Sequence, residues 1–243
     1  MEPVSLRDKV VVVTGGGSGL GAAICRRLSR DGAIMVICDV QADAAESVAE
    51  ELRSQGHRAH VYRLDVGNEP QVRTITQAIL DQFTRVDILI NNAGTDVTKP
   101  FEQIDIAEWN RVIDVNLRGA FLLSRLLYPW MRHEGYGHIV NIVSTAAKRA
   151  WTDASAYHAS KWGLLGLSHA LHAEGRRYGV RVTAVVSGGM RTPFILDRFP
   201  DIDQSTLQDP AVVAETVHFA LTLPAESVMP EVMVVPVKET SWP

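Results

Sequence analysis

Seven short runs rich in valine and isoleucine recur along the chain, separated by stretches whose apolar residues have helical spacing. The runs are nearly continuous in apolar residues rather than alternating, which is typical of strands covered on both faces. Strands that alternate with helices form parallel sheets from βαβ units. The predicted strands lie in KVVVVTG, IMVICDV, HVYRLDV, VDILINNAG, GHIVNIVS, VRVTAVVSGG and EVMVVPV.

The helical stretches connect consecutive strands in short steps, with no internal repeat or low-complexity linker. This organisation predicts one α/β domain over residues 1–243, a Rossmann-like doubly wound parallel sheet with helices on both faces. Residues 188–210 lack a clear period, and a loop of this length is expected to be a substrate lid. Helices are expected near 19–31, 41–55, 69–83, 106–133, 155–178 and 209–222.

Composition narrows the class of partner. A chain of 243 residues that is 46% hydrophobic can bury one large core. The net charge of −4, without long charged runs, argues against nucleic acid or an anionic membrane and favours a small-molecule substrate. No apolar stretch reaches the ~18 residues of a membrane span, and a cytoplasmic protein is expected. Cys25 and Cys38 lack metal or disulfide spacing, which predicts buried thiols and no metal.

The segment VVVTGGGSGLGAAI places five glycines between Thr14 and Gly21, after a predicted strand and before a predicted helix. Glycine permits positive φ in a tight turn and lets a pyrophosphate approach the amides of a helix N-terminus. Gly21 is expected to let the helix pack on the sheet. Tight βα turns also use glycine for steric reasons alone, so this segment by itself leaves cofactor binding and an ordinary turn equally open.

Asp39 ends the second predicted strand, about 20 residues after the glycine turn, where a carboxylate can bind the adenosine ribose diol. A carboxylate there repels the 2′-phosphate of NADP(H), and no Arg or Lys lies within the turn or directly after Asp39 to neutralise it. NAD(H) is therefore predicted in preference to NADP(H). The alternative role for Asp39 is to cap the following helix, and both roles can hold.

The sequence TGGGSGLG matches the TGxxxGxG pattern of the short-chain dehydrogenase/reductase family, which the chain resembles over roughly residues 7–237. LDV at 64–66, NNAG at 91–94, VIDVNLRGAF, IVNIVSTAA and YHASK at 157–161 match in the same order. The resemblance implies cofactor contacts from Gly15, Gly17, Ser18, Gly19, Leu20, Gly21, Asp39, Asp65, Val66, Asn91, Ala93, Gly94, Tyr157, Lys161, Gly188 and Thr192.

The resemblance also implies a catalytic tetrad of Asn116, Ser144, Tyr157 and Lys161. Tyr157 would exchange the proton of the alcohol while hydride passes to or from nicotinamide. Lys161 lies four residues later on the same helix face and is expected to lower the phenol pKa from its ordinary value near 10. Ser144 is expected to stabilise charge on the substrate oxygen. Asn116 would complete a water-linked proton path to Lys161.

Ser187 departs from the family pattern, which usually has proline before Gly188, so the loop on the nicotinamide side is expected to be less preorganised. His158 is expected to point away from the reacting groups, because it lies about a quarter turn from Tyr157 on a helix.

Several side chains near the predicted pocket have two open interpretations. Lys148, Arg149 and Trp151 form either a solvated surface or a pocket wall that suits an anionic or aromatic substrate. Lid residues either line the pocket with an apolar surface or only pack; they are Arg191, Phe194, Ile195, Leu196 and Phe199.

Two predicted helices, 106–133 and 155–178, are apolar over more than one face, which predicts a homodimer or homotetramer. The favoured function is an NAD(H)-dependent oxidoreductase that interconverts a secondary alcohol and a ketone. The alternatives are an NADPH-dependent 3-ketoacyl-type reductase, a non-catalytic NAD(H)-binding regulatory protein, and a structural subunit. The sequence names no particular substrate.

Overall fold

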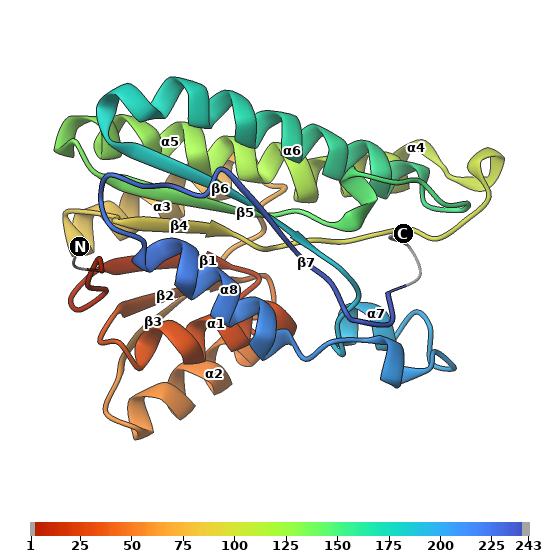
Figure 1. The fold of residues 1–243 in the computed structure, drawn as a ribbon, viewed down its shortest axis with the longest axis horizontal. Coiled ribbons are helices and arrows are strands. Elements are labelled where there is room, and N and C mark those ends of the chain that lie inside the picture. The colour runs from red at the N-terminus through yellow and green to blue at the C-terminus, as the bar shows by residue number, and fades with distance from the viewer. Residues whose placement is uncertain (1–2, 240–243) are drawn as a thin grey trace.

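A parallel sheet of seven strands forms the centre of the computed structural model, which describes residues 3–239 (Figure 1). The strand order is β3-β2-β1-β4-β5-β6-β7, so the chain winds outward in both directions from β1. The predicted doubly wound Rossmann-like sheet is confirmed. The strands are β1 (Val10–Thr14), β2 (Ile34–Asp39), β3 (Arg58–Arg63), β4 (Ile88–Asn91), β5 (Gly137–Ile142), β6 (Val180–Ser187) and β7 (Glu231–Val234).

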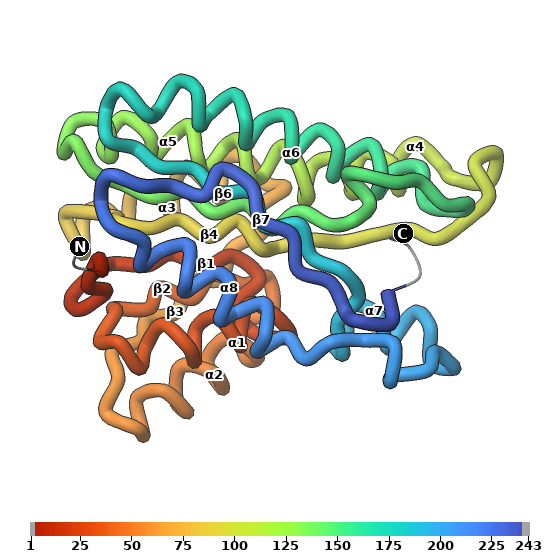
Figure 2. Tube along the Cα trace, in the orientation of Figure 1, coloured from red at the N-terminus to blue at the C-terminus, as the bar shows by residue number. Residues whose placement is uncertain are grey.

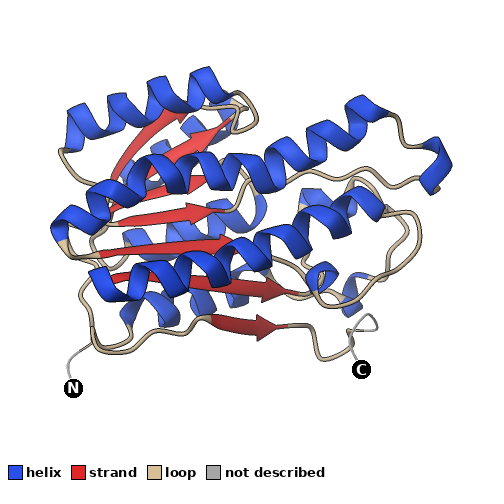
Figure 3. Cartoon of the chain, turned by 90° about the horizontal axis from the view of Figure 1, so that it is seen from above, coloured by secondary structure: helices blue, strands red, loops and turns tan. Residues whose placement is uncertain are grey.

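Helices cover both faces of the sheet, with α1, α2 and α8 on one face and α3, α5 and α6 on the other (Figures 1 and 3). Within residues 3–239, no helix combines the length and apolar character that crossing a membrane requires. The helices are α1 (Gly19–Ser29), α2 (Ala42–Ser54), α3 (Glu69–Phe83), α4 (Ile106–Ile113), α5 (Gly119–Glu134), α6 (Ser155–Gly175), α7 (Pro193–Leu196) and α8 (Pro210–Thr222).

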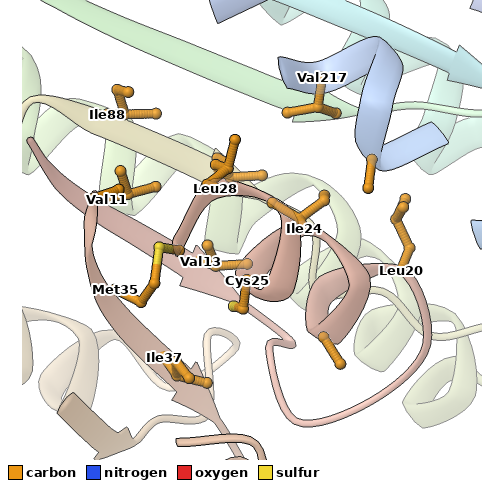
Figure 4. Packing of buried hydrophobic residues seen from close by; sticks show 14 of the residues in the cluster. Val11, Val13, Leu20, Ile24, Cys25, Leu28, Met35, Ile37, Ile88 and Val217 are labelled. Atoms are coloured by element: carbon orange, nitrogen blue, oxygen red, sulfur yellow. The ribbon is translucent and has the colours of Figure 1, made fainter. Parts of the chain in front are cut away.

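The alternation of side chains along β1 supplies both halves of the core. Val11 and Val13 pack with Ile24 of α1 on one face, as Figure 4 shows, while Val10 and Val12 belong to the cluster under α3 and α5. Strands β1, β4, β5 and β6 are buried along their whole length, as their continuous apolar runs predict. The edge strands β3 and β7 depart from this expectation because each has a neighbouring strand on one side only and is partly exposed.

The single helix expected over 106–133 is interrupted. One π-helical turn, Asp114–Arg118, separates α4 from α5 and contains Asn116. Gly119 follows it, where a Cβ atom would lie 2.8 Å from the Val66 backbone oxygen. This close approach fixes the start of α5 against the loop after β3, and the wide turn allows Asn116 to be 1% exposed.

All strands run in one direction, so their carboxyl ends share one edge of the sheet. The register places Thr14 beside Cys38 and Asn91 beside Asn141 at this edge. The segment 188–210 leaves the same edge after β6 and carries α7 and a 3-10 turn, Gln204–Thr206 (Figure 2). Cys25 and Cys38 are buried and free, as predicted.

Candidate active site

The glycine turn between β1 and α1 is shaped by backbone contacts that no side chain could tolerate. Gly15 has a φ of +63°, and a Cβ atom there would lie 2.9 Å from Ala93 Cα. A Cβ atom on Gly21 would lie 2.0 Å from the Gly15 backbone oxygen. Gly21 therefore lets α1 pack closely against the turn where β1 leaves the sheet.

The N-terminus of α1 fits a pyrophosphate because no side chain caps it. Ser18 occupies the N-cap position with an extended backbone, but its side chain accepts no hydrogen bond from the first turn, which also has no acidic residue. The first amides of a helix need acceptors and carry a partial positive charge. Helices α3, α4 and α8, in contrast, are capped by Asn68, Asp105 and Asp209.

Asp39 links the glycine turn to the end of β2. Its Oδ2 accepts a hydrogen bond from the Gly17 amide at 2.9 Å, and its Oδ1 accepts one from the Gln41 amide at 2.9 Å. Helix α2 begins two residues after Val40 with Gln41 as its N-cap, so Asp39 does not cap it and the alternative role is wrong. Each carboxylate oxygen has lone pairs beyond these bonds with which to accept from ribose hydroxyls.

The NNAG segment after β4 supports the turn from the other side. The Asn92 side chain donates to the backbone oxygens of Thr14 (2.9 Å) and Gly15 (3.0 Å), a role that the sequence analysis missed although the second asparagine of the motif was in view. The Asn91 side chain donates instead to Ser124 and Asn141 in the interior. The side chain thus holds the sheet edge, and the cofactor contact expected from Asn91 stays a prediction.

The loops on the adenine and nicotinamide sides also lie at this edge. Asp65 Oδ1 accepts from the Gly67 amide at 2.9 Å and Val66 is buried. On the other side, the Gly188 amide donates to the Val234 backbone oxygen at 2.9 Å, so β7 orders the backbone that Ser187 was expected to leave less preorganised. Thr192 is 5% exposed and faces Gly19 of the glycine turn.

Three of the four predicted catalytic side chains meet where β5 ends and α6 begins. Tyr157 is hydrogen-bonded to Ser144 and lies with Lys161 on α6. The Lys161 ammonium is 5.6 Å from the centre of the Tyr157 ring and donates to the Ile142 backbone oxygen at 2.8 Å. The i to i+4 spacing on one helix thus produces the expected pairing.

Burial controls the protonation of this pair. It raises the pKa of Tyr157 to about 12; the Ser144 hydrogen bond and Arg198 act in the opposite direction, and Asp96 adds to the rise. Burial also lowers the pKa of Lys161 to about 8. The expectation that Lys161 holds the phenol pKa below its ordinary value is wrong for the side chains of this protein alone, because desolvation disfavours both the phenolate and the ammonium.

Asn116 holds neighbouring segments together. Its Oδ1 accepts from the Thr95 amide at 2.7 Å, and its Nδ2 donates to the Thr95 backbone oxygen and to Ser160 Oγ at 2.8 and 2.9 Å. Lys161 donates elsewhere, so a direct Asn116–Lys161 hydrogen bond is not formed. A Cβ atom placed on Gly94 would lie 3.6 Å from Asn116 Oδ1 and 3.9 Å from Lys161 Nζ, so both groups lie near that glycine.

His158 points away from Tyr157, as expected, and fastens the loop that follows β5. Its Nδ1 donates to the Ala146 backbone oxygen at 2.8 Å, and its Nε2 accepts from the Trp151 amide at 3.1 Å. Lys148 forms an ion pair with Glu231 of β7 at 2.7 Å. That pairing argues against its suggested role in binding an anionic substrate.

The lid places one charged side chain near Tyr157 that the sequence analysis missed. The Phe194 ring lies 5.9 Å from the Tyr157 ring, and the Arg198 guanidinium lies 3.8 Å over Phe194. Asp96, which follows the NNAG segment, lies beside Arg198 with 3.7 Å between Oδ2 and Nη1. No local signal in the sequence joins these two segments, because they meet only in the folded chain.

A Rossmann-like sheet with an uncapped glycine turn and a buried Tyr-Lys pair at one edge defines a nicotinamide-dependent oxidoreductase. The family model described as short chain dehydrogenase matches residues 9–202, and the chain belongs to this short-chain dehydrogenase/reductase family. The predicted family resemblance is confirmed.

Relatives with named activities support the class. The cis-4-hydroxycyclohexanecarboxylate dehydrogenase of Sinomonas cyclohexanicum is 34% identical over 237 residues, which cover 94% of this chain and 95% of the relative. A metagenomic short-chain oxidoreductase solved with NADP is 33% identical with a TM-score of 0.86, covering 96% of this chain and 99% of that one. The 3-ketoacyl-(acyl-carrier-protein) reductase of Brucella melitensis, solved with NADH, is 31% identical with a TM-score of 0.88 and the same coverages.

Proposed function

We propose that the protein interconverts a secondary alcohol and a ketone with NAD(H), and that Tyr157 is its acid and base. The observation that carries this proposal is the convergence of Tyr157, Ser144 and Lys161 at the sheet edge that also bears the glycine turn. A cyclic alcohol is the first substrate class to test, because the Sinomonas relative is named for a hydroxycyclohexane acid.

The nicotinamide ring, when bound, supplies or accepts the hydride. In oxidation, the phenolate form of Tyr157 accepts the proton of the substrate hydroxyl, and in reduction the neutral phenol of Tyr157 donates that proton back. Ser144 holds the same substrate oxygen by a hydrogen bond. Lys161, with a pKa of about 8, is the nearby group that exchanges a proton close to neutral pH, and Asn116 positions the loop beside it.

The test compares wild type, Tyr157→Phe and the matched surface control Tyr62→Phe on a panel of secondary alcohols, ketones and a 3-ketoacyl thioester. Turnover is followed by nicotinamide absorbance. General acid-base catalysis contributes about 10²- to 10⁴-fold, so we expect Tyr157→Phe to lose at least roughly 100-fold while NADH binding and Tyr62→Phe activity persist. A Tyr157→Phe variant with wild-type turnover would refute the role. NADH binding without turnover in wild type would favour the regulatory alternative.

We propose that the protein prefers NAD(H) to NADP(H). The argument rests on the carboxylate of Asp39, which lies against Gly17 of the turn. A 2′-phosphate placed there meets a negative charge and no matching Arg or Lys in the turn. Titration of intrinsic fluorescence with NADH and NADPH, for wild type and Asp39→Ala, tests this. We expect the preference for NADH to fall by about 10- to 100-fold in the variant, as loss of hydrogen bonds to a charged group implies. Tighter binding of NADPH by wild type would contradict the proposal.

We also propose a homodimer or homotetramer formed through α5 and α6. Trp130 of α5 and Trp162 of α6 are 44% and 51% exposed, large apolar areas that a second copy would cover. A single-chain mass by light scattering at micromolar concentration would contradict this assembly. The two buried free thiols fit the reducing cytoplasm, which we propose as the compartment.

A further inference from the structure

Arg198 belongs to the lid and lies close to Tyr157, with the Phe194 ring between them. Its guanidinium stacks on Phe194 at 3.8 Å, and the Phe194 ring lies 5.9 Å from the Tyr157 ring. The positive charge of Arg198 acts on Tyr157, whose pKa it lowers. The stacking of Arg198 on Phe194, and of Phe194 near Tyr157, places this charge on the lid side of the phenol.

The guanidinium of Arg198 has donors without acceptors. Among residues 3–239, its one ion-pair partner is Asp96 at 3.7 Å, which is beyond hydrogen-bond distance. Arg26, in contrast, donates three hydrogen bonds to Glu51 at 2.7 to 3.0 Å. A guanidinium carries five donors, so Arg198 keeps donors that a bound molecule can use.

The Asp96 carboxylate has other partners besides Arg198. Its Oδ1 accepts from the Val97 amide at 2.7 Å, and its side chain is 9% exposed. Arg111 of α4 also acts on it, donating to the Asp96 backbone oxygen at 3.3 Å. Asp96 therefore lies between two arginines, and Asp197 is a second carboxylate that acts on Arg198. The charges around Arg198 balance in number, so it is the unused donors of the guanidinium that suit a substrate carboxylate.

We propose that Arg198 binds a carboxylate of the substrate, remote from the hydroxyl that Tyr157 deprotonates. Phe194 lies between the two, so the bound molecule has an apolar body, against that ring, that separates its carboxylate from its reacting carbon by several bonds. A hydroxy acid with a six-membered ring between the two groups fits this order, and a 2-hydroxy acid does not. This assignment rests on the proposed alcohol dehydrogenase function.

Kinetics with matched substrates tests the site: cis-4-hydroxycyclohexanecarboxylate against its methyl ester, for wild type, Arg198→Met and the distant surface control Arg73→Met. A hydrogen-bonded charge contributes enough for about a 10- to 100-fold loss of kcat/KM on the acid in Arg198→Met. When each variant is compared at the plateau of its own pH profile, so that the shift in the Tyr157 pKa does not enter, we expect the ester to change by less than about threefold, and Arg73→Met to match wild type on both. Equal losses on acid and ester, or none, would overturn the proposal.

Binding without turnover separates this proposal from the proposed function. Calorimetry in the presence of NADH compares cyclohexanecarboxylate with the neutral cyclohexanecarboxamide. We expect wild type to prefer the carboxylate and Arg198→Met to lose the preference. Preference without any alcohol oxidation would leave the site standing and count against the proposed function. Oxidation of neutral alcohols by a protein that shows no preference for the carboxylate would support the proposed function and refute the Arg198 site.

A double variant distinguishes recognition from charge compensation of Asp96. If Arg198 recognises the substrate, Asp96→Asn retains the carboxylate preference, because it removes a repelling charge, and Asp96→Asn/Arg198→Met lacks it. If Arg198 only neutralises Asp96, the double variant binds the carboxylate as wild type does, and the proposal fails.

Discussion

Replacing Lys161 with methionine should be more favourable to the stability of the fold near neutral pH than in alkali. Burial lowers the pKa of Lys161 from 10.5 to about 8. The folded state therefore binds fewer protons than the unfolded chain between these values, and stability rises with pH across that interval. The contribution of Lys161 to wild-type stability is therefore lowest below pH 8 and highest above pH 10.5.

The size of the effect follows from linkage. At 1.36 kcal/mol per pKa unit, the penalty for the buried ammonium is slightly above ~3 kcal/mol at pH 7 and slightly below ~1 kcal/mol at pH 10, so the difference between the two pH values is about 2.5 kcal/mol. Lys161→Met also leaves the Ile142 oxygen without its donor, which costs about 1 to 3 kcal/mol at every pH. Only the pH-dependent part of the stability difference between wild type and Lys161→Met reports on the burial of the ammonium.

Urea unfolding of wild type and Lys161→Met at several values from pH 7 to 10 measures this part. We expect the variant's stability relative to wild type to fall by about 2.5 kcal/mol as the pH rises over this range. Lys99→Met, at a side chain 42% exposed, controls for the substitution itself. A difference between wild type and Lys161→Met that does not change with pH would refute the reasoning that burial disfavours the ammonium.

Two further predictions concern the frame of the site. Gly21→Ala puts a Cβ atom 2.0 Å from the Gly15 backbone oxygen, so we expect its free energy of unfolding in urea to fall by more than about 3 kcal/mol. The control is Gly166→Ala, where a Cβ atom meets no atom within 4 Å and the free energy of unfolding should rise by about 0.5 to 1 kcal/mol. His158→Phe leaves two backbone groups without the hydrogen bonds that the His158 ring makes, so the free energy of unfolding should fall by about 1 to 3 kcal/mol. In the same variant kcat/KM should be reduced while NADH affinity is kept. Unchanged stability in either variant would contradict its argument.

The fold was accessible from sequence because its information is local. Continuous apolar runs mark strands buried on both faces. The glycines between Thr14 and Gly21 mark a turn that packs closely against the backbone of Ala93. The doubly wound sheet and the pairing of Tyr157 with Lys161 both follow from such segments. The π-helical turn at Asn116 was not identified from the apolar period, because it occupies a single turn within a long stretch that is apolar on more than one face.

The electrostatics of the site was not accessible in this way. A pKa depends on burial and on charges from distant segments, and the spacing of Tyr157 and Lys161 predicts their proximity without their desolvation. Asp96 and Arg198 meet from the loop after β4 and the lid after β6. Lys148 looked available for an anion in the sequence, yet the fold pairs it with Glu231.

The charge of Arg198 couples substrate recognition to the proton of Tyr157. Arg198 lowers the pKa of the phenol, so a carboxylate bound to the guanidinium cancels part of that effect and the pKa of Tyr157 rises. For alcohol oxidation, the profile of kcat against pH should therefore lie at higher pH for cis-4-hydroxycyclohexanecarboxylate than for its methyl ester. In Arg198→Met the two profiles should coincide, because the charge to be cancelled is gone. A profile for the acid at equal or lower pH in wild type would show that the carboxylate does not bind at Arg198.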